Sequence, residues 1–348
     1  MLSHLKILVM GGKTILVTGG AGYIGSHVVR QLGERGENVV VLDDLSTGFS
    51  EAVLFGNLVI GNTGDAACLK DIFEAHDIDT VLHFAAKTIV PESVADPLLY
   101  YGNNTCSSRT LLEACVKYGV SHFVFSSTAA VYGIPADGIA SENSPTQPIN
   151  PYGGSKLMTE TMLRDVSAAH PLRSVVLRYF NVAGSDPEGR IGQSTRRATL
   201  LTKVACEAAV GKRDSVSIFG TDYDTPDGTG VRDYIHVEDL ADAHLRALDY
   251  LRNAGDSTVL NCGYGRGYSV REVIETVEKA AGMELNKIES PRRAGDPPQL
   301  IAAADKIHDV LGWVPRFDKL DVIAESSLRW ERHLLTHPWG TQKHIGAS

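Results

Sequence analysis

The chain has 348 residues, a formal net charge of −9, and five scattered cysteines. Its length allows one large domain or two smaller ones, and its negative charge argues against general nucleic-acid binding. An odd number of cysteines without a Cys-x-x-Cys pair predicts reduced thiols in a cytoplasmic protein with no metal site. No apolar run reaches membrane-spanning length, which predicts no membrane association. Residues 1–12 precede the first expected strand, and we expect them to be a start-site extension or an expression remnant.

A glycine turn follows the first expected strand, which covers residues 14–18. Gly19, Gly22 and Gly25 are spaced by three, and a helical pattern over 27–33 follows them. The first glycine lets the chain turn, the second lets backbone approach a pyrophosphate, and the third lets the helix pack on the strand. The helix N-terminus then attracts the phosphates. The pattern therefore predicts dinucleotide binding, and the alternative is a tight turn in another kind of α/β protein.

Asp43 ends the second expected strand, whose apolar run covers residues 39–42. A carboxylate about 20 residues beyond the glycines accepts hydrogen bonds from ribose hydroxyls. It also repels a 2′-phosphate, so the sequence favours NAD over NADP.

Strand and helix patterns alternate through the first half of the chain. We expect further strands at 58–61, 80–86, 123–128 and 174–179, and helices at 68–75, 105–118 and 155–168. This alternation predicts right-handed crossovers and an open, doubly wound parallel sheet, which is a Rossmann-like α/β fold.

The second half of the chain is richer in loops. We expect helices at 200–210 and 237–251, a strand at 216–219, and a capping box at Ser269 that opens a helix reaching 281,. Loops are expected at 184–197, 223–230 and 291–298. The sequence thus predicts an NAD-binding domain over 13–183, to which the chain returns near 231–262. A smaller C-terminal α/β substrate-binding domain would comprise 184–230 and 263–340.

Tyr152 and Lys156 are four residues apart, so that both side chains lie on one face of the expected helix,. Tyrosine is a weak base near neutral pH, but a neighbouring ammonium group favours the phenolate. Thr128 ends a strand, and its hydroxyl can bind a substrate oxygen that loses its proton. The spacing alone is also typical of an ordinary surface helix, and only the preceding glycine turn and strand end favour a catalytic role.

Several segments resemble the extended short-chain dehydrogenases/reductases. They are Gly19–Gly25, Tyr152–Lys156 and Leu177–Asn181, while Gly228–Val237 and Pro291–Asp296 resemble segments of the UDP-glucose 4-epimerases within that family. The resemblance covers residues 13 to about 330.

The resemblance implies roles for individual residues. Tyr152 would be the base, Lys156 its partner and Thr128 the hydroxyl donor. Cofactor contacts would come from Gly19, Gly22, Tyr23, Ile24, Gly25, Asp43, Asp44, Leu45, Ser46, Asn62, Thr63, Phe84, Ala85, Ala86, Asn103, Ser126, Tyr152, Lys156 and Phe180. Contacts to a UDP-sugar would come from Thr128, Tyr152, Asn181, Phe219, Arg232, Arg293, Asp296 and Leu300.

The implied reaction interconverts UDP-glucose and UDP-galactose by oxidation at C4, rotation of the 4-keto sugar and re-reduction. A residue at position 300 smaller than tyrosine also implies some activity on the N-acetylated pair. The resemblance further implies a homodimer formed through the helices near 105–118 and 155–168. Two alternatives are a nucleotide-sugar 4,6-dehydratase or decarboxylase, and a non-catalytic NAD-binding regulator.

Three positions depart from the family's pattern. Thr88 stands where the family often has lysine, so we assign no cofactor contact to the neighbouring Lys87. Asn62 replaces the usual aspartate near the adenine, and its amide oxygen can still accept a hydrogen bond. Leu200 replaces a polar residue that often faces the diphosphate. The histidines form no group that indicates a metal site or a catalytic base.

Overall fold

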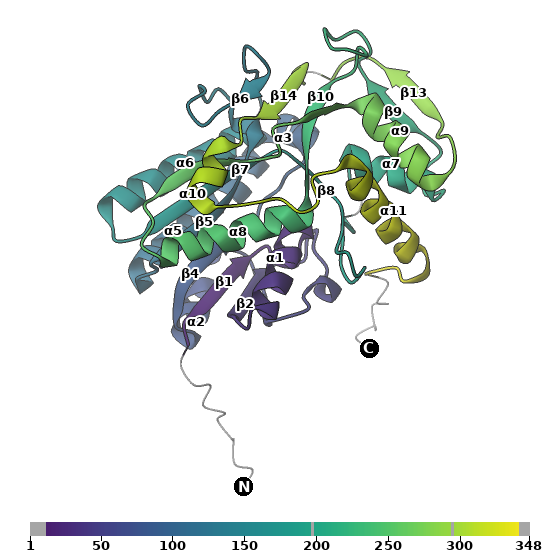
Figure 1. Ribbon diagram of the computed structural model, residues 1–348. Coiled ribbons are helices and arrows are strands. Elements are labelled where there is room, and N and C mark those ends of the chain that lie inside the picture. The colour runs from purple at the N-terminus through teal and green to yellow at the C-terminus, as the bar shows by residue number, and fades with distance from the viewer. Residues whose placement is uncertain (1–11, 196–197, 294–295, 341–348) are drawn as a thin grey trace.

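A seven-stranded parallel sheet forms the centre of the molecule (Figure 1). The computed structural model describes residues 12–195, 198–293 and 296–340. The strand order is β11-β7-β5-β4-β1-β2-β3. Their bounds are β1 Thr14–Thr18, β2 Asn38–Asp43, β3 Asn57–Ile60, β4 Ile78–His83, β5 His122–Thr128, β7 Arg173–Tyr179 and β11 Thr258–Cys262. This sheet confirms the expected Rossmann-like α/β fold.

Helices cover both faces of this sheet and create a hydrophobic core on each side. One core includes side chains of α1 Tyr23–Glu34, α8 Val237–Arg252 and α10 Asp305–Leu311. The other includes side chains of α2 Ala66–Ala75, α5 Ser107–Tyr118 and α6 Pro151–Ala169. Burial on both faces explains why strands such as β1 and β5 are continuous runs of buried residues,.

Short elements connect the larger ones. They are the 3-10 turns η1 Ser50–Ala52 and η3 Ala129–Val131, the helices α3 Val90–Ala95 and α4 Pro97–Tyr100, and the π-helical turn η2 Tyr101–Cys106, which leads directly into α5.

A second group of elements lies beyond the carboxyl ends of the central strands. β10 Val231–His236 pairs with β8 Asn181–Ala183, β12 Gly267–Ser269 and β14 Gln299–Ala302, and β14 also pairs with β6 Ile139–Ala140. A further pair is β9 Val216–Phe219 with β13 Lys287–Ser290. The helices α7 Leu201–Ala209, α9 Val270–Ala281 and α11 Leu320–Thr336 pack together around their own apolar core (Figure 1).

Some boundaries differ from the sequence predictions. α6 begins at Pro151 rather than near 155, because the Asn150 side chain accepts a 2.9 Å hydrogen bond from the Gly153 amide and proline suits the first helical position,. α1 begins at Tyr23, and β4 ends at His83 rather than at 86. The capping box at Ser269 is confirmed.

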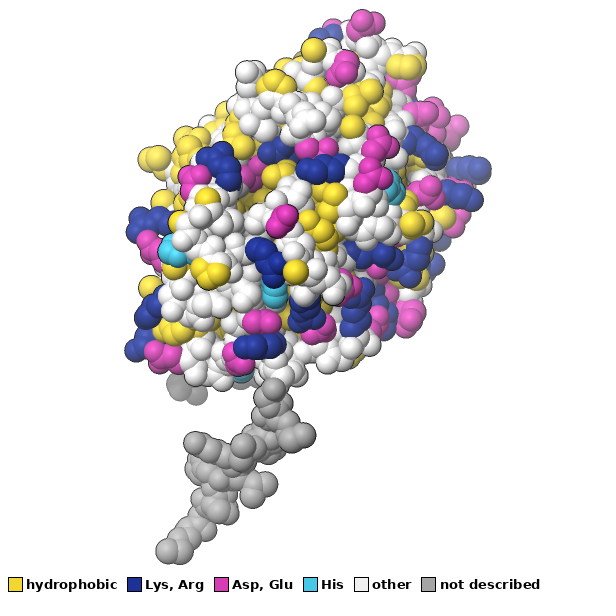
Figure 2. Space-filling view, turned by 60° about the vertical axis from the view of Figure 1, so that its left-hand side comes forward, with side chains coloured by type: hydrophobic (Ala, Val, Ile, Leu, Met, Phe, Trp, Pro, Cys, Tyr) yellow, Lys and Arg dark blue, Asp and Glu magenta, His cyan; other side chains and the backbone are white. Residues whose placement is uncertain are grey.

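The surface turned forward in Figure 2 intersperses Lys and Arg with Asp and Glu, and exposes hydrophobic side chains between them. Among the described residues there is no helix long and apolar enough to cross a membrane. In the same part of the chain no group of His, Cys, Asp and Glu could hold a metal ion. All five cysteines are free.

Candidate active site

The turn between β1 and α1 has no room for a side chain at Gly19 or Gly25. A Cβ atom at Gly19 would lie 2.5 Å from the Ala85 backbone nitrogen, and one at Gly25 would lie 2.2 Å from the Gly19 oxygen. Gly22 is the N-cap residue of α1, and no side chain among the described residues caps this end of the helix. The helix therefore presents free N–H groups and its positive dipole end, as an anion-binding site requires.

Asp43 connects this turn to the end of β2. Its carboxylate accepts hydrogen bonds from the Ala21 amide at 2.9 Å and the Leu45 amide at 2.8 Å. Burial raises the pKa of Asp43, and these backbone donors act against the increase. The nearby Asn62 donates to Asp44 at 3.2 Å, and its amide oxygen accepts from the Gly64 N–H at 2.7 Å. The side chains of Asp43, Asp44 and Asn62 thus lie at the ends of β2 and β3, where Asp43 was predicted to bind the ribose.

Tyr152, Lys156 and Thr128 lie together where α6 crosses the end of β5. The Thr128 hydroxyl lies close enough to the Tyr152 phenol to affect its pKa, and Lys156 donates to the Ser126 carbonyl oxygen at 2.8 Å. Burial raises the pKa of Tyr152, while the neighbouring Thr128 hydroxyl lowers it. Burial lowers the pKa of Lys156 to about 7, and Glu160 acts in the opposite direction. The chain alone thus disfavours the phenolate, and a positive charge bound beside Tyr152 would oppose this effect.

The loop after β4 approaches the glycine turn from the other side. Lys87 bonds through its backbone to both ends of the Asn104 amide, at 2.8 and 3.0 Å. Asn104 also accepts from Asn103 at 3.1 Å and donates to Ser155 of α6 at 3.0 Å. Asn104 thereby fixes the loop containing the predicted cofactor residues Phe84, Ala85 and Ala86 relative to the helix of Tyr152.

Several predicted substrate residues also lie near one another. The guanidinium carbon of Arg293 lies 3.7 Å from the ring centroid of Phe219. Arg232 of β10 is paired with Leu300 of β14, and Asn181 of β8 is paired with Tyr234 two residues further along β10. The backbone N–H of Asp296 donates to the backbone carbonyl oxygen of Arg293 at 3.4 Å. Leu300 is 9% exposed and belongs to the core on the α8 side of the sheet.

The remaining predicted residues occupy other parts of the same edge. The Tyr23 hydroxyl donates to the Gly184 oxygen at 2.6 Å. Leu45 and Ser46 line a hollow together with residues 47–51, Thr195 and Gly340. Thr63 and Phe180 are buried, Ile24 is partly buried, and Ser126 is hydrogen-bonded to the Tyr179 hydroxyl.

Two buried polar residues at this site were not predicted from the sequence. Asn104 follows the predicted Asn103, and nothing in its sequence context distinguishes the two amides. Glu160 comes four residues after Lys156, so extending the helical spacing by one turn would have found it. It forms an ion pair with Arg178 of β7.

The histidines mostly behave as the sequence indicated. Both ring nitrogens of His83 are hydrogen-bonded, to Thr18 at 2.6 Å and to Ser108 at 2.8 Å. Burial lowers the pKa of His83 to about 3, so it is neutral. His244 differs, because its Nε2 atom is buried and has no partner in the described part of the chain.

The residues present fit a bound dinucleotide. The glycine turn, the uncapped N-terminus of α1 and the Asp43 carboxylate match a pyrophosphate and a ribose. The partly buried Tyr152 and the buried Lys156 lie across from them, near the end of β5. This arrangement defines an enzyme that uses a dinucleotide cofactor.

Comparison with known proteins specifies the class further. The model of the NAD dependent epimerase/dehydratase family matches residues 15–263, and the chain belongs to this family. Its cofactor is NAD.

The chain is similar to enzymes named UDP-glucose 4-epimerase. One from Azospirillum brasilense is 59% identical over 321 residues, which cover 92% of each chain. A crystal structure from Bifidobacterium longum, in complex with NAD+ and UDP, is 40% identical with a TM-score of 0.87, covering 92% of this chain and 98% of that one. The UDP-Glc/GlcNAc 4-epimerase from Campylobacter jejuni is 48% identical with a TM-score of 0.81, covering 92% and 100%.

Proposed function

We propose that the protein interconverts UDP-glucose and UDP-galactose. The observation that carries this proposal is that Tyr152 and Lys156, one helical turn apart on α6, meet Thr128 and Ser126 at the end of β5. The similarity to UDP-glucose 4-epimerases over nine-tenths of the chain supports the choice of substrate.

Tyr152 is the base that takes the proton from the 4-hydroxyl of the sugar and returns it after the sugar has turned. Thr128 orients that hydroxyl from the end of β5, where its own hydroxyl lies near the phenol. Lys156, held by the Ser126 carbonyl, favours the phenolate through its charge,. NAD, when bound, accepts the hydride from C4 and returns it to the opposite face. The glycine turn, Asp43 and the loop at Phe84–Ala86 hold the dinucleotide.

The nucleotide part of the substrate is held away from the reacting carbon. Arg232 and Arg293 supply guanidinium groups that suit a diphosphate. Phe219, Asn181 and Asp296 complete this side of the site. Holding the substrate through its nucleotide leaves the sugar free to rotate, which epimerisation requires.

A dehydratase needs an acid and a base for elimination beside the strand-end threonine. Here Ala129 and Ala130 follow Thr128, and neither can transfer a proton. A non-catalytic regulator has no need for Tyr152, Lys156 and the Thr128 hydroxyl together. Both alternatives are therefore less well supported than epimerisation.

We also propose activity on the N-acetylated UDP-sugars. Leu300 lies beside Arg232 where the family's pattern has the residue bordering the sugar's C2 substituent. Leucine leaves more room there than tyrosine does. The similarity to the UDP-Glc/GlcNAc 4-epimerase from Campylobacter jejuni supports this proposal.

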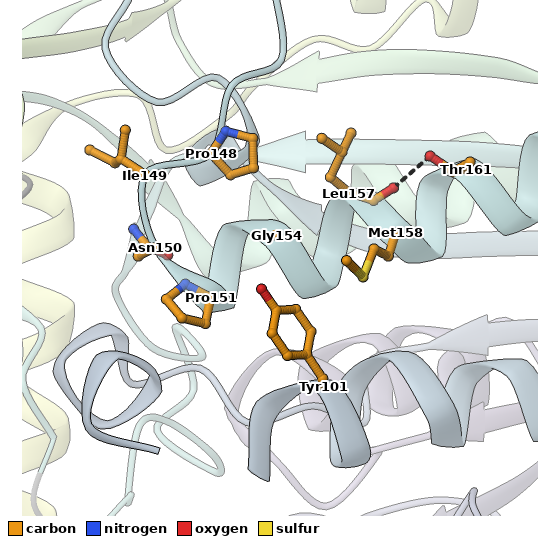
Figure 3. Close-up of a pocket in the computed structure, with 9 residues that line it drawn as sticks. All are labelled: Tyr101, Pro148, Ile149, Asn150, Pro151, Gly154, Leu157, Met158 and Thr161. Carbon is orange, nitrogen blue, oxygen red and sulfur yellow. Dashed lines mark hydrogen bonds between the residues drawn. The ribbon is translucent and has the colours of Figure 1, made fainter. Parts of the chain in front are cut away.

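We propose that the protein is a homodimer that pairs through α5 and α6. Figure 3 shows a hollow along the outer side of α6, into which Tyr101 of η2 points. Pro148, Ile149, Leu157 and Met158 line it, and Met158 is 47% exposed. An apolar surface of this kind on a helix is best covered by another copy of the same helix.

The division into an NAD-binding unit at 13–183 and 231–262 and a substrate-binding unit elsewhere remains our proposal. The membership of β11 in the central sheet supports it. A cytoplasmic location is supported by the five free thiols,.

The assay that tests the proposed function follows conversion of UDP-galactose to UDP-glucose by the purified protein before and after bound NAD is removed. The rate should fall to background without NAD and recover when NAD is added back. A rate that persists unchanged without NAD would exclude this mechanism.

A further inference from the structure

A buried ion pair between Glu160 and Arg178 lies one helical turn after Lys156 on α6. Glu160 and Arg178 are each 6% exposed. The Glu160 carboxylate accepts hydrogen bonds from Arg178 Nε at 3.0 and 3.2 Å and from its Nη2 at 2.5 Å. It also accepts one from the hydroxyl of Ser127. Removing two charges from water costs several kcal/mol, so such a pair is weak support for stability by itself.

The fold brings this pair to the reacting residues. Tyr152, Lys156 and Glu160 are four residues apart, so they share one face of α6,. Two successive residues of β5 meet this face: the carbonyl of Ser126 binds Lys156 and the hydroxyl of Ser127 binds Glu160. One short piece of strand therefore positions both the ammonium and the carboxylate.

Arg178 is itself held in place from the other side. It donates to the Tyr132 hydroxyl at 3.0 Å, and that hydroxyl donates to Asn261 at 2.6 Å. The guanidinium carbon lies 4.9 Å from the centroid of the Tyr132 ring. Arg178 cannot turn away from Glu160 without breaking these contacts, so the pair is a fixed part of the site.

The charges explain what the pair does for Lys156. Burial lowers the pKa of Lys156 to about 7, and the carboxylate of Glu160 raises it. Without that carboxylate, Lys156 would share a buried region with the cation of Arg178 alone. Burial next to another positive charge favours loss of the lysine proton.

Other titratable groups around α6 carry no competing charge at this point. They are His83 of β4, whose pKa burial lowers to about 3; Tyr132, which follows η3, and Tyr179 of β7, whose pKa values burial raises; and Tyr100 of α4, which donates to Glu92 of α3. Tyr101 of η2 faces Gly154, and Arg109 and Glu113 of α5 pair with each other at the surface.

We propose that Glu160 is a positioning residue of the reaction, which keeps Lys156 in its ammonium form through a buried carboxylate fixed by Ser127 and Arg178. This inference rests on the proposed function, since it assigns the partner of the proposed Tyr152–Lys156 pair. Its consequence is that Glu160 sets the upper end of the pH range in which the enzyme is active.

The test is the pH dependence of kcat for UDP-galactose in wild type, Glu160→Gln, Glu160→Asp and Arg178→Gln. Tyr152 and Lys156 titrate as a pair, so the apparent pKa values of the acidic and alkaline limbs describe the pair and neither residue alone. Glu160→Gln keeps the size of the side chain but removes its charge, and should move the alkaline limb down by about 1 pH unit. Glu160→Asp should restore the limb at least in part, and Arg178→Gln should move it upward.

Damaged packing would not move the alkaline limb in opposite directions in Glu160→Gln and Arg178→Gln, so the opposite shifts identify a charge effect. Thermal unfolding of each variant shows that the protein being assayed is folded. The proposal is overturned if the alkaline limb of folded Glu160→Gln coincides with that of the wild type. It is also overturned if the alkaline limb moves to lower pH in both Glu160→Gln and Arg178→Gln. Failure of the proposed function itself is distinguishable, because the wild type would then show no epimerisation at any pH.

Discussion

A side chain at Gly25 would collide with the backbone of Gly19, since a Cβ there would lie 2.2 Å from the Gly19 carbonyl oxygen. Real Cβ atoms do not come so close to backbone, so the turn must shift to accept one. Gly25→Ala should therefore move the N–H groups at the start of α1 away from the pyrophosphate. We expect NAD retention through gel filtration to fall at least tenfold.

Gly102 in η2 offers a matched control, because in the described part of the chain no neighbouring atom lies within 4 Å of a Cβ built there. Gly102→Ala should keep its NAD, and should be stabilised by about 0.5–1 kcal/mol because alanine favours the helix. Full retention of NAD by Gly25→Ala would mean that the turn has more freedom than the geometry indicates.

His244 should make the protein sensitive to acid. Its Nδ1 donates to the Leu240 carbonyl at 2.8 Å, and burial lowers its pKa to about 4. An unfolded histidine titrates near pH 6.5, so the stability that the neutral ring contributes is complete above pH 6.5 and is lost as the pH falls toward 4. Between these values one such histidine adds a slope of about 1.4 kcal/mol per pH unit.

Urea unfolding of wild type and His244→Leu from pH 7.5 to 4.5 measures this slope. The variant should be less stable at pH 7.5 because it loses the ring contact with Phe84, whose centroid lies 4.7 Å away. It should lose less stability than wild type on acidification. Equal slopes for the two proteins would show that the pKa of His244 is the same in the folded and unfolded states.

The hollow on α6 predicts the effect of a charge at its edge. Met158→Asp places a carboxylate on the surface that we expect a second copy to cover, and burying it there is costly. The mass from light scattering at micromolar concentration should fall from that of a dimer to that of a monomer.

Leu54→Asp is the control, since Leu54 is another exposed hydrophobic residue, 38% exposed, outside this hollow. It should leave the mass unchanged. A monomer mass for the wild type, or a dimer mass for Met158→Asp, would remove the support for pairing through α6.

Leu300 should influence which sugars are accepted. Leu300→Tyr fills space beside the C2 substituent and should reduce kcat/KM for UDP-N-acetylglucosamine selectively, by about 1–3 kcal/mol in transition-state binding. The variant Leu300→Met conserves volume and should leave the ratio of the two activities unchanged. Equal losses on both sugars in Leu300→Tyr would point to disturbed packing in the core instead.

The central sheet could be predicted from the sequence because its strands are buried on both faces. Continuous apolar runs such as Phe123–Phe125 and glycines at fixed spacing are local signals, and they need no knowledge of distant contacts. The α6 boundary was missed because Pro151 looks like a break, although proline is well suited to the first turn of a helix.

The smaller strands could not be predicted in the same way. β8 and β12 have three residues each and β6 has two, and they exist because β10 and β14 lie beside them. Tyr152 and Lys156 were found because their spacing is local. The helical spacing also reaches Glu160, but its pairing with Arg178 and the contact of Asn104 with Ser155 join segments 18 to 51 residues apart, which no local pattern predicts.

The most direct test of the account is the epimerase activity of Tyr152→Phe, compared with its bound NAD. Removing one hydroxyl removes the base but leaves the ring in place. General acid–base catalysis contributes about 10²–10⁴-fold, so kcat for UDP-galactose should fall by that factor while the NAD content stays equal to that of the wild type. Activity close to that of the wild type, with NAD still bound, would contradict the assignment of Tyr152 as the base and the mechanism built on it.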